Sequence, residues 1–448
     1  MRTPICDFVQ SYLDQKPLRL HMPGHKGEGI PENRDITEIG GADVLYHTRG
    51  IIRESEEYAA SLFGSRRTFY SAEGASLCIR AMLFLARLHA AEKLRPPLIL
   101  AGRNAHRSFW TAAALLDLRV EGLPGESLLT CRPSAGEIAW RLDEMEELPA
   151  AVYLTSPDYQ GCRADVKAIA SVCHARDVPL LVDNAHGAYL KFLPGATHPL
   201  EAGADLVCDS AHKTLPVLTG GAYLHTGVKA PALFTGQGER ALEMFASTSP
   251  SWLILQSLDH CNLLLANQLP EKLEKMARET EVLKKRLAET GYTVAGIGEA
   301  WERSDPLKLT LFPKAYGYTG DALHEMLRKS RIECEFSDPD SLVMMISPGT
   351  GKEGLQQLEA ALRSIPRREQ IREEPPDLPV PERILSLREA MTGLTEEVPA
   401  EKSSGHILAD ACVSCPPAVP AVVCGEIIPD EAIPVLQYYG TQEVWVIT

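Results

Sequence analysis

The sequence predicts an α/β protein with a mainly parallel sheet in a large domain, followed by a small α+β domain and a C-terminal α+β unit. Through the first half of the chain, short β-branched runs alternate with amphipathic helical segments. This alternation is typical of a parallel sheet that is covered by helices on both faces. The pattern changes near Pro250, and the stretch Pro366–Pro381 has the Pro, Arg and Glu content of a linker. We therefore expect domains at 1–250, 251–366 and 376–448.

The strand candidates of the large domain are short apolar runs that end in polar loops. They are Thr68–Ser71, Leu98–Ala101, Ala151–Thr155, Pro179–Asp183, Asp205–Asp209 and Ala222–His225. Amphipathic periodicity predicts helices at Ser76–Ala91, Ser108–Leu116 and Asp165–Ala175. Ligands of such sheets bind at the carboxyl ends of the strands, so we expect functional side chains in the loops that follow these runs.

The later part of the chain mixes helices and strands. Helices are expected at Ser251–Ala266, Glu271–Thr290, Gly320–Lys329 and Gly354–Ile365, and strands at Leu307–Phe312, Ile332–Glu335 and Leu342–Ser347. The C-terminal unit is expected to end on the strand Glu443–Ile447. The order of these elements predicts a compact α+β unit on each side of the linker.

Composition argues against several classes of protein. The formal net charge of −15 disfavours a nucleic-acid partner, which would need a basic face. The apolar stretches are too short to cross a bilayer, and Met1–Pro17 lacks the pattern of a signal peptide, so we expect a cytoplasmic protein without a membrane partner. The eleven cysteines are then expected to be reduced thiols, and the lone pair Cys412 and Cys415 to be packing residues rather than a metal site.

Asp183 and Lys213 carry the strongest chemical signal. Asp183 ends one apolar strand candidate, and Lys213 closes the run Asp209-Ser210-Ala211-His212-Lys213 after the next one. Pyridoxal phosphate (PLP) chemistry needs a lysine that holds the aldehyde as a Schiff base and a carboxylate that keeps the pyridine nitrogen protonated. Taken singly, each residue has a plainer interpretation, as a helix cap or a surface lysine.

Other polar residues would complete a PLP site. Glu73-Gly74-Ala75-Ser76 lies between a strand and a helix candidate, where small residues and free N–H groups favour a phosphate. Ser210 and His212 could add phosphate contacts, and His106 could stack on the ring and later move a proton. Each piece alone is weak, since a glycine there could be only a turn residue and a loop histidine only a cap. Their co-occurrence favours the PLP interpretation.

Several motifs together resemble the bacterial ornithine/lysine/arginine decarboxylases. His21-Met22-Pro23-Gly24-His25-Lys26-Gly27 resembles the H-x-P-G-H-x-G signature of that family. Asp183-Asn184-Ala185-His186-Gly187 resembles its D-x-A-H-G segment, and Ser210-Ala211-His212-Lys213 its S-x-H-K attachment site. Near the C-terminus, Cys424-Gly425-Glu426 is similar to the family's P-G-E. The resemblance runs from about His21 to the end of the chain.

The resemblance implies a short form of the family with the fold-type-I, aspartate-aminotransferase-like architecture. It implies that PLP is attached to Lys213, that Asp183 faces the pyridine nitrogen, that His106 stacks on the ring and that His186 lies near the ring hydroxyl. The phosphate would be held by Gly74, Ala75, Ser76, Ser210 and His212. It also implies a homodimer, or an assembly of dimers, with active sites at the subunit interface.

The chain departs from the family pattern at a few positions. Ala75 stands where a hydroxyl residue is common, Asp158 where threonine is frequent, and Gly220-Gly221 follow the lysine where a glutamine is often found. Pro416-Pro417-Ala418-Val419-Pro420 differs from the usual P-P-G-I-P. These departures leave the cofactor prediction intact and the identity of the substrate open.

The expected reaction is decarboxylation of arginine, lysine or ornithine to the corresponding di- or polyamine. The distal cation of such a substrate needs an acidic partner, for which Glu335 and Glu426 are the candidates, although each could equally be a solvated carboxylate. One alternative is a PLP-dependent aminotransferase or lyase of the same fold, which would not release carbon dioxide. A second alternative is a catalytically silent regulatory relative, against which an imine absorption band would argue.

Overall fold

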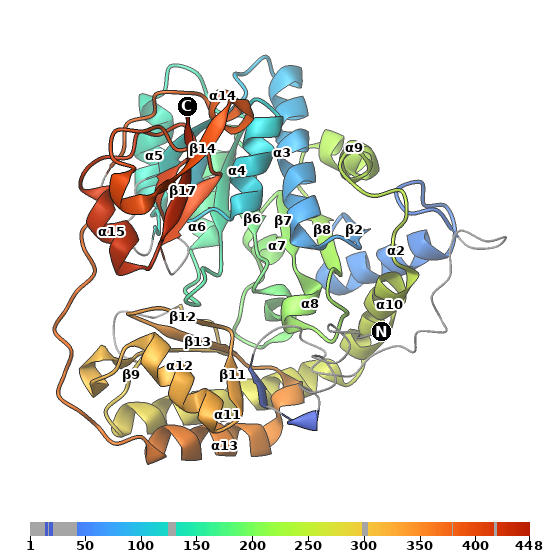
Figure 1. The fold of residues 1–448 in the computed structure, drawn as a ribbon. Helices are drawn as coiled ribbons and strands as arrows, with labels where there is room; N and C mark the ends of the chain where they lie inside the picture. The colour runs from blue at the N-terminus through green and yellow to red at the C-terminus, as the bar shows by residue number, and fades with distance from the viewer. Residues whose placement is uncertain are drawn as a thin grey trace, which may run out of the picture.

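The computed structural model describes residues 14–16, 18–20, 43–123, 131–297, 303–378, 380–415 and 419–448. The large domain is built on a seven-stranded sheet with the strand order β2-β8-β7-β6-β5-β3-β4 (Figure 1). Only β8 runs antiparallel to its two neighbours; all other neighbours are parallel. The strands are β2 (Arg67–Ser71), β3 (Leu98–Gly102), β4 (Arg119–Leu123), β5 (Ala151–Thr155), β6 (Leu180–Asp183), β7 (Leu206–Asp209) and β8 (Ala222–Thr226).

Helices cover both faces of this sheet, as the alternating pattern predicts. A large apolar core joins one face to α3 and α4, and a second core joins the other face to α5 and α6. Within the described part of the chain, α3 is the one helix long and apolar enough to cross a membrane, but it packs against α4, α9, β7 and β8 with most of its side chains buried. The helices of the domain are α2 (Ile51–Phe63), α3 (Gly74–Glu92), α4 (Arg107–Leu115), α5 (Ala135–Glu144), α6 (Val166–His174), α7 (Pro199–Ala202), α8 (Ala211–Thr214) and α9 (Ala232–Glu243).

The edge strand β4 was not expected from the sequence. Its residues include Arg119, Glu121 and Gly122, and most of the strand is exposed or half-buried. Strands buried on both faces are continuous apolar runs, whereas an edge strand tolerates polar residues, so the apolar pattern that marks the other strands is missing here.

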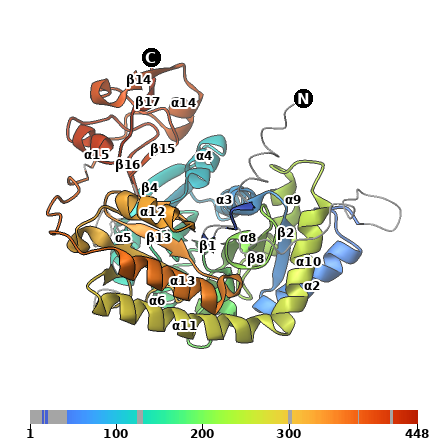
Figure 2. The same cartoon turned by 60° about the horizontal axis from the view of Figure 1, so that its bottom comes forward.

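The small domain packs its helices and a four-stranded sheet below the large domain in the view of Figure 1, and Figure 2 brings this side forward. The short strand β1 (Leu18–Leu20) pairs in parallel with β11. This segment precedes the large domain in the sequence, and the pairing places it against the small domain. The elements are α10 (Trp252–Ala266), α11 (Leu269–Glu289), β9 (Thr293–Val294), β10 (Lys308–Phe312), α12 (Gly320–Lys329), β11 (Ile332–Cys334), β12 (Phe336–Ser337), β13 (Leu342–Met345) and α13 (Gly351–Ser364).

The C-terminal unit has an apolar core made mostly of its own side chains and lies against α4, on the side away from α2 and α10 (Figures 1 and 2). Before it, the described part of 366–381 contains no helix or extended strand, although Arg368 and Ile371 donate backbone hydrogen bonds to Tyr316 and Lys314. The elements are α14 (Leu387–Thr392), β14 (Thr395–Pro399), β15 (Cys412–Cys415), β16 (Val419–Val423), α15 (Ala432–Tyr438) and β17 (Glu443–Ile447). The domain limits themselves stay a prediction.

Candidate active site

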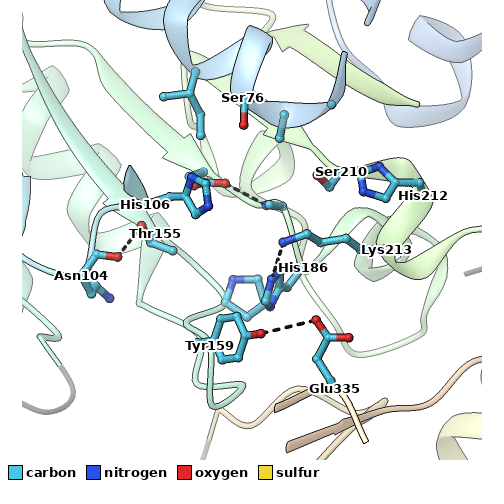
Figure 3. A pocket seen from close by; sticks show the side chains of 16 residues that line it. Ser76, Asn104, His106, Thr155, Tyr159, His186, Ser210, His212, Lys213 and Glu335 are labelled. Atoms are coloured by element: carbon cyan, nitrogen blue, oxygen red, sulfur yellow. Dashed lines mark hydrogen bonds between the residues drawn. The ribbon is translucent and has the colours of Figure 1, made fainter. Parts of the chain in front are cut away.

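A pocket of about 410 Å³ opens at the carboxyl ends of the parallel strands, facing the small domain (Figure 3). Every residue predicted to bind the cofactor lines it, and so does Glu335, whereas Glu426 does not. The lining residues are Gly74, Ala75, Ser76, Ile79, Asn104, His106, Thr155, Pro157, Tyr159, Asp183, Ala185, His186, Ser210, His212, Lys213 and Glu335.

Strand order explains why residues that are distant in sequence meet here. Asp183 is the last residue of β6, and Ser210 directly follows the neighbouring strand β7. Asp183 is paired with Cys208 across the parallel register, so the loop after β7 lies beside it and α8 brings Lys213 to the same edge. The ends of β5 and β3 add Thr155 and the loop that carries His106.

The Asp183 carboxylate is 2% exposed and held by neutral donors. Its Oδ2 accepts a hydrogen bond from the Tyr153 hydroxyl at 3.2 Å, and its Oδ1 accepts one from the Ala185 backbone N–H at 3.1 Å. The Cys208 thiol donates to Oδ1 at 3.4 Å. A buried carboxylate without cationic donors can face a cationic partner in the pocket. Burial lowers the pKa of both Lys213 and His106, and the negative charge of Asp183 opposes that lowering.

Lys213 reaches into the pocket from α8, and its Nζ lies 2.9 Å from His186 Nε2 (Figure 3). Burial lowers the pKa of Lys213, while the negative charges of Asp183 and Glu335 act in the opposite direction. Desolvation disfavours the ammonium form, and a neutral amine is the nucleophilic form that attacks a carbonyl. Lys213 therefore has the surroundings of a reactive lysine.

The start of α3 forms the side of the pocket that suits an anion. Gly74 has φ +72° and donates its N–H to the Gly220 carbonyl at 2.7 Å. Ala75 and Ser76 follow in the first turn of this 19-residue helix, and all three residues line the pocket. The N–H groups of a first helical turn have no partner within the helix and are therefore suited to bind an anion. The Ser76 hydroxyl accepts a hydrogen bond from Ser108 at 2.8 Å.

The two glycines that depart from the family pattern are required by packing beneath this turn. A Cβ on Gly220 would lie 2.8 Å from the Ala72 carbonyl oxygen, and a Cβ on Gly221 would lie 2.3 Å from Val217 Cγ1. The Gly221 carbonyl also accepts both the backbone N–H of His212 and its ring Nδ1, at 3.1 and 3.0 Å. These contacts hold the segment that leads into Lys213.

His106 lies across the pocket from Lys213 and caps α4 (Figure 3). Its Nδ1 accepts the Ser108 backbone N–H at 3.2 Å, which leaves Nε2 as the protonated nitrogen of the neutral ring. The ring lines an open pocket and is exposed to solvent there, yet the protein packed around it lowers its pKa by desolvation. His106 is thus both the N-cap of α4 and a residue of the pocket lining.

Asp158, another departure from the family pattern, holds the turn that presents Tyr159. Its Oδ1 accepts the Cys162 backbone N–H at 2.8 Å, and its Oδ2 accepts Arg132 Nε at 3.2 Å. The Tyr159 hydroxyl in turn donates to Glu335 Oε1 at 3.4 Å (Figure 3). Glu335 comes from the small domain, between β11 and β12, so the two domains meet at this contact.

Glu426, our second candidate for the substrate cation, lies elsewhere. Its carboxylate is 4% exposed and accepts both terminal nitrogens of Arg103, at 2.7 and 3.0 Å. It also accepts the Val423 backbone N–H at 2.9 Å, and Arg383 lies at 3.5 Å. Glu426 is not among the residues that line the pocket, and these donors already use both oxygens of its carboxylate. Within one chain, Glu426 is therefore not placed to bind a substrate in this pocket.

Tyr153 and Lys308 are buried polar residues beside the pocket that had no role in the sequence analysis. Tyr153 is buried within β5 and reaches Asp183 on the adjacent strand. Lys308 begins β10 and contacts the outer nitrogen of His186 at 2.7 Å. Lys308 is the one charged residue of the strand candidate Leu307–Phe312, and this was a signal that could have identified it.

The His21–Gly27 motif lies outside the described residues, as does the 416–418 part of the proline-rich segment. Cys412 is half-buried in β15, and the side chain of Cys415 is outside the description. Among the residues that the structure describes, no cluster of three or more His, Cys, Asp or Glu could hold a metal ion.

Comparison with solved structures gives the class of protein to which this fold belongs. Lysine decarboxylase A from Pseudomonas aeruginosa is similar with a TM-score of 0.73 and 18% identity, over 92% of this chain and 73% of that one. Serine palmitoyltransferase from Sphingomonas wittichii is similar with a TM-score of 0.55 and 15% identity, over 72% of this chain and 79% of that one. The chain has the fold-type-I architecture of PLP-dependent enzymes, as predicted.

Sequence similarity narrows the class to one family. The major domain of the Orn/Lys/Arg decarboxylases matches residues 3–119 and 134–295. The arginine decarboxylase of Bacillus subtilis (strain 168) is 30% identical over 96% of this chain and 92% of its own length. The chain belongs to the Orn/Lys/Arg decarboxylase family, which confirms the predicted resemblance, and it is an amino-acid decarboxylase.

Proposed function

We propose that this protein uses PLP to decarboxylate a basic amino acid, arginine, lysine or ornithine, to the corresponding di- or polyamine. The observation that carries the proposal is one pocket in which a half-buried lysine, from the helix that follows β7, and a buried carboxylate at the end of the neighbouring strand β6 face a glutamate of the small domain. Lys213, Asp183 and Glu335 are those three residues. The family match and the arginine decarboxylase relative support the same substrate class.

The donor set of the pocket fits PLP. Lys213 would hold the aldehyde carbon, and the Asp183 carboxylate, which accepts only neutral donors from Tyr153, Ala185 and Cys208, would face the protonated pyridine nitrogen. His106 would stack on the ring, and His186 would lie near its hydroxyl. The phosphate would be held by the first turn of α3 and the segment after β7, that is by Gly74, Ala75, Ser76, Ser210 and His212.

When bound, PLP supplies the electron sink for the pair of electrons left at Cα once carbon dioxide departs. The chain contributes the electrostatics and the proton. Asp183, buried at the end of β6, would place its negative charge beside the protonated pyridine nitrogen. Burial strengthens the attraction between the two charges. Lys213 Nζ or His106 Nε2 then delivers a proton to Cα, since both residues line the pocket.

Glu335 is the proposed partner of the substrate's distal cation. It lines the pocket on the side of the small domain, close to the Tyr159 hydroxyl, and its charge acts on Lys213. A cation that leaves water needs such a partnered carboxylate, and a charge-assisted hydrogen bond is stronger than a neutral one. This position opposite Lys213 suits an amino acid that carries a second cation at the end of its side chain.

The proposal includes a homodimer, or an assembly of dimers, in the cytoplasm. The resemblance to the decarboxylases supports this part, and sedimentation of the purified protein tests the assembly. A monomer that is fully active would contradict it.

The deciding experiment combines a substrate screen with cofactor mapping. The purified protein with PLP is offered arginine, lysine, ornithine, and neutral and acidic amino acids, and carbon dioxide release is measured. Borohydride reduction followed by peptide mass spectrometry then locates the cofactor. Release from a basic amino acid with the label on Lys213 is expected. Transamination or elimination without carbon dioxide would favour the aminotransferase or lyase alternative, and a protein without an imine band would favour the silent relative.

A further inference from the structure

Lys308 is a buried lysine that lies behind the pocket rather than in it. Its side chain is 3% exposed, and it is not among the lining residues. Its Nζ lies 3.2 Å from the Asp158 carbonyl oxygen, 3.0 Å from the Tyr159 carbonyl oxygen and 2.7 Å from His186 Nδ1. An ammonium group has three N–H donors, and these three acceptors use all of them.

This geometry determines which nitrogen of His186 carries the proton. A charged Lys308 has no lone pair, so His186 Nδ1 must accept its hydrogen bond. Burial lowers the pKa of Lys308 to about 8, which leaves it mostly protonated at neutral pH. Burial lowers the pKa of His186 well below its ordinary value, so its ring is neutral. The one ring proton is then on Nε2.

The Nε2–H of His186 faces Lys213 Nζ at 2.9 Å. An N–H donor needs a lone pair opposite it, and only the neutral amine of Lys213 has one. If Lys213 were an ammonium group, both nitrogens of His186 would face cations, and one hydrogen bond would be lost. With Lys308 charged, the row Lys308, His186, Lys213 therefore has one arrangement in which every hydrogen bond is made.

We propose that Lys308 is a positioning residue that fixes His186 as the Nε2–H tautomer and thereby holds Lys213 as the neutral, nucleophilic amine. This inference rests on the proposed function, in which Lys213 carries the cofactor. It goes further because it identifies residues of the chain itself that keep Lys213 in its neutral, reactive form. Two backbone carbonyls alone would make Lys308 a structural residue; the short contact to His186 Nδ1 connects it to the reactive amine.

The test measures how readily Lys213 reacts in the full chain from which PLP has been removed. Formaldehyde and cyanoborohydride methylate neutral amines, and peptide mass spectrometry gives the rate at Lys213 as a function of pH. Lys308→Met removes the donor and should raise the Lys213 pKa, so that the rate at neutral pH falls roughly tenfold. The matched control is Lys284→Met, which removes a lysine that is 1% exposed and donates to the Asp305 carbonyl, outside the pocket lining. It should leave the Lys213 rate unchanged.

A double-mutant cycle separates the tautomer from the charge of Lys308. In a His186→Phe background, Lys308→Met should have no further effect on the Lys213 rate, because the connecting ring is gone. The other titratable groups that act on Lys213 or His186, namely Asp183, Glu335, Cys208, His106 and His212, are the same in both halves of the cycle. An equal effect of Lys308→Met with and without His186 would mean that charge acts through space, and would overturn the proposal, as would no effect in either background.

Lys308→Gln keeps the test decisive if the Met variant does not fold. The neutral amide still offers an N–H to His186 Nδ1, so it should keep the Lys213 rate near that of the wild type, and a fall would overturn the proposal. The readout is also independent of the proposed function. If borohydride places PLP on another lysine, the proposed function fails, while the methylation rates still report whether Lys308 controls Lys213.

Discussion

Replacing Glu426 by glutamine tests whether this residue is structural or binds the substrate. Its Oε2 accepts both Arg103 Nη2 at 2.7 Å and the Val423 N–H at 2.9 Å, and its Oε1 accepts Arg103 Nη1 at 3.0 Å. A glutamine amide has one oxygen, so its NH₂ group must face an N–H donor in either orientation. Glu426→Gln therefore removes the negative charge and also places the glutamine NH₂ group opposite an N–H donor, so that one hydrogen bond is lost.

The expected cost is about 2 kcal/mol in the free energy of unfolding. Breaking a fully buried ion pair costs about 3–5 kcal/mol, and we reduce this figure to about 2 kcal/mol because solvent reaches the arginines and because Gln keeps one acceptor. The side chains of Arg103 and Arg383 are 20% and 30% exposed. Urea unfolding measures the change, and Glu397→Gln, at an exposed position of β14, is the matched control.

The same variant should leave KM for the basic substrate unchanged, because Glu426 does not line the pocket. An increase in KM together with unchanged stability would refute the structural interpretation and restore Glu426 as a substrate ligand. A loss of stability without a change in KM would instead show that the carboxylate ties the C-terminal unit to the loop before His106.

Three further predictions concern the large domain, the substrate and the linker. Asp183→Asn should keep the fold but lower kcat by roughly two to three powers of ten, since the amide cannot stabilise a protonated ring nitrogen; near-normal turnover would remove Asp183 from the site. Glu335→Gln should raise KM for the basic amino acid roughly tenfold or more while the PLP absorption stays the same, and an unchanged KM would exclude it as the cation's partner. Limited proteolysis should cut first within 366–381, and resistance of that stretch would mean that its contacts to Tyr316 and Lys314 hold it down.

The core strands of the large domain could be predicted because burial on both faces leaves a direct mark in the sequence. β5, β6 and β7 are fully or almost fully buried, and each is a continuous apolar run close to the predicted limits. The edge strand β4 carries no such run. The pairing of β1 with β11 joins segments more than three hundred residues apart, and no local pattern reports such a partner.

The site shows the same division between local and long-range information. Lys213 and Asp183 could be predicted because chemistry-bearing residues at strand ends gather at one edge of a parallel sheet. The role of Glu426 could not, because its partner Arg103 lies 323 positions away in the chain and a carboxylate looks the same whether it binds an arginine or a substrate. Lys308 and Tyr153 acquire their partners only when strands or domains pack together.

The sequence by itself thus determined the fold class, the family resemblance and the residues expected to hold the cofactor, since periodicity and strand-end motifs are local properties. The tertiary structure alone decided which acidic residue faces the pocket and which buried lysine touches His186. The physical reason is that the state of an ionisable side chain depends on its desolvation and on the donors and acceptors within hydrogen-bonding distance, and packing sets both.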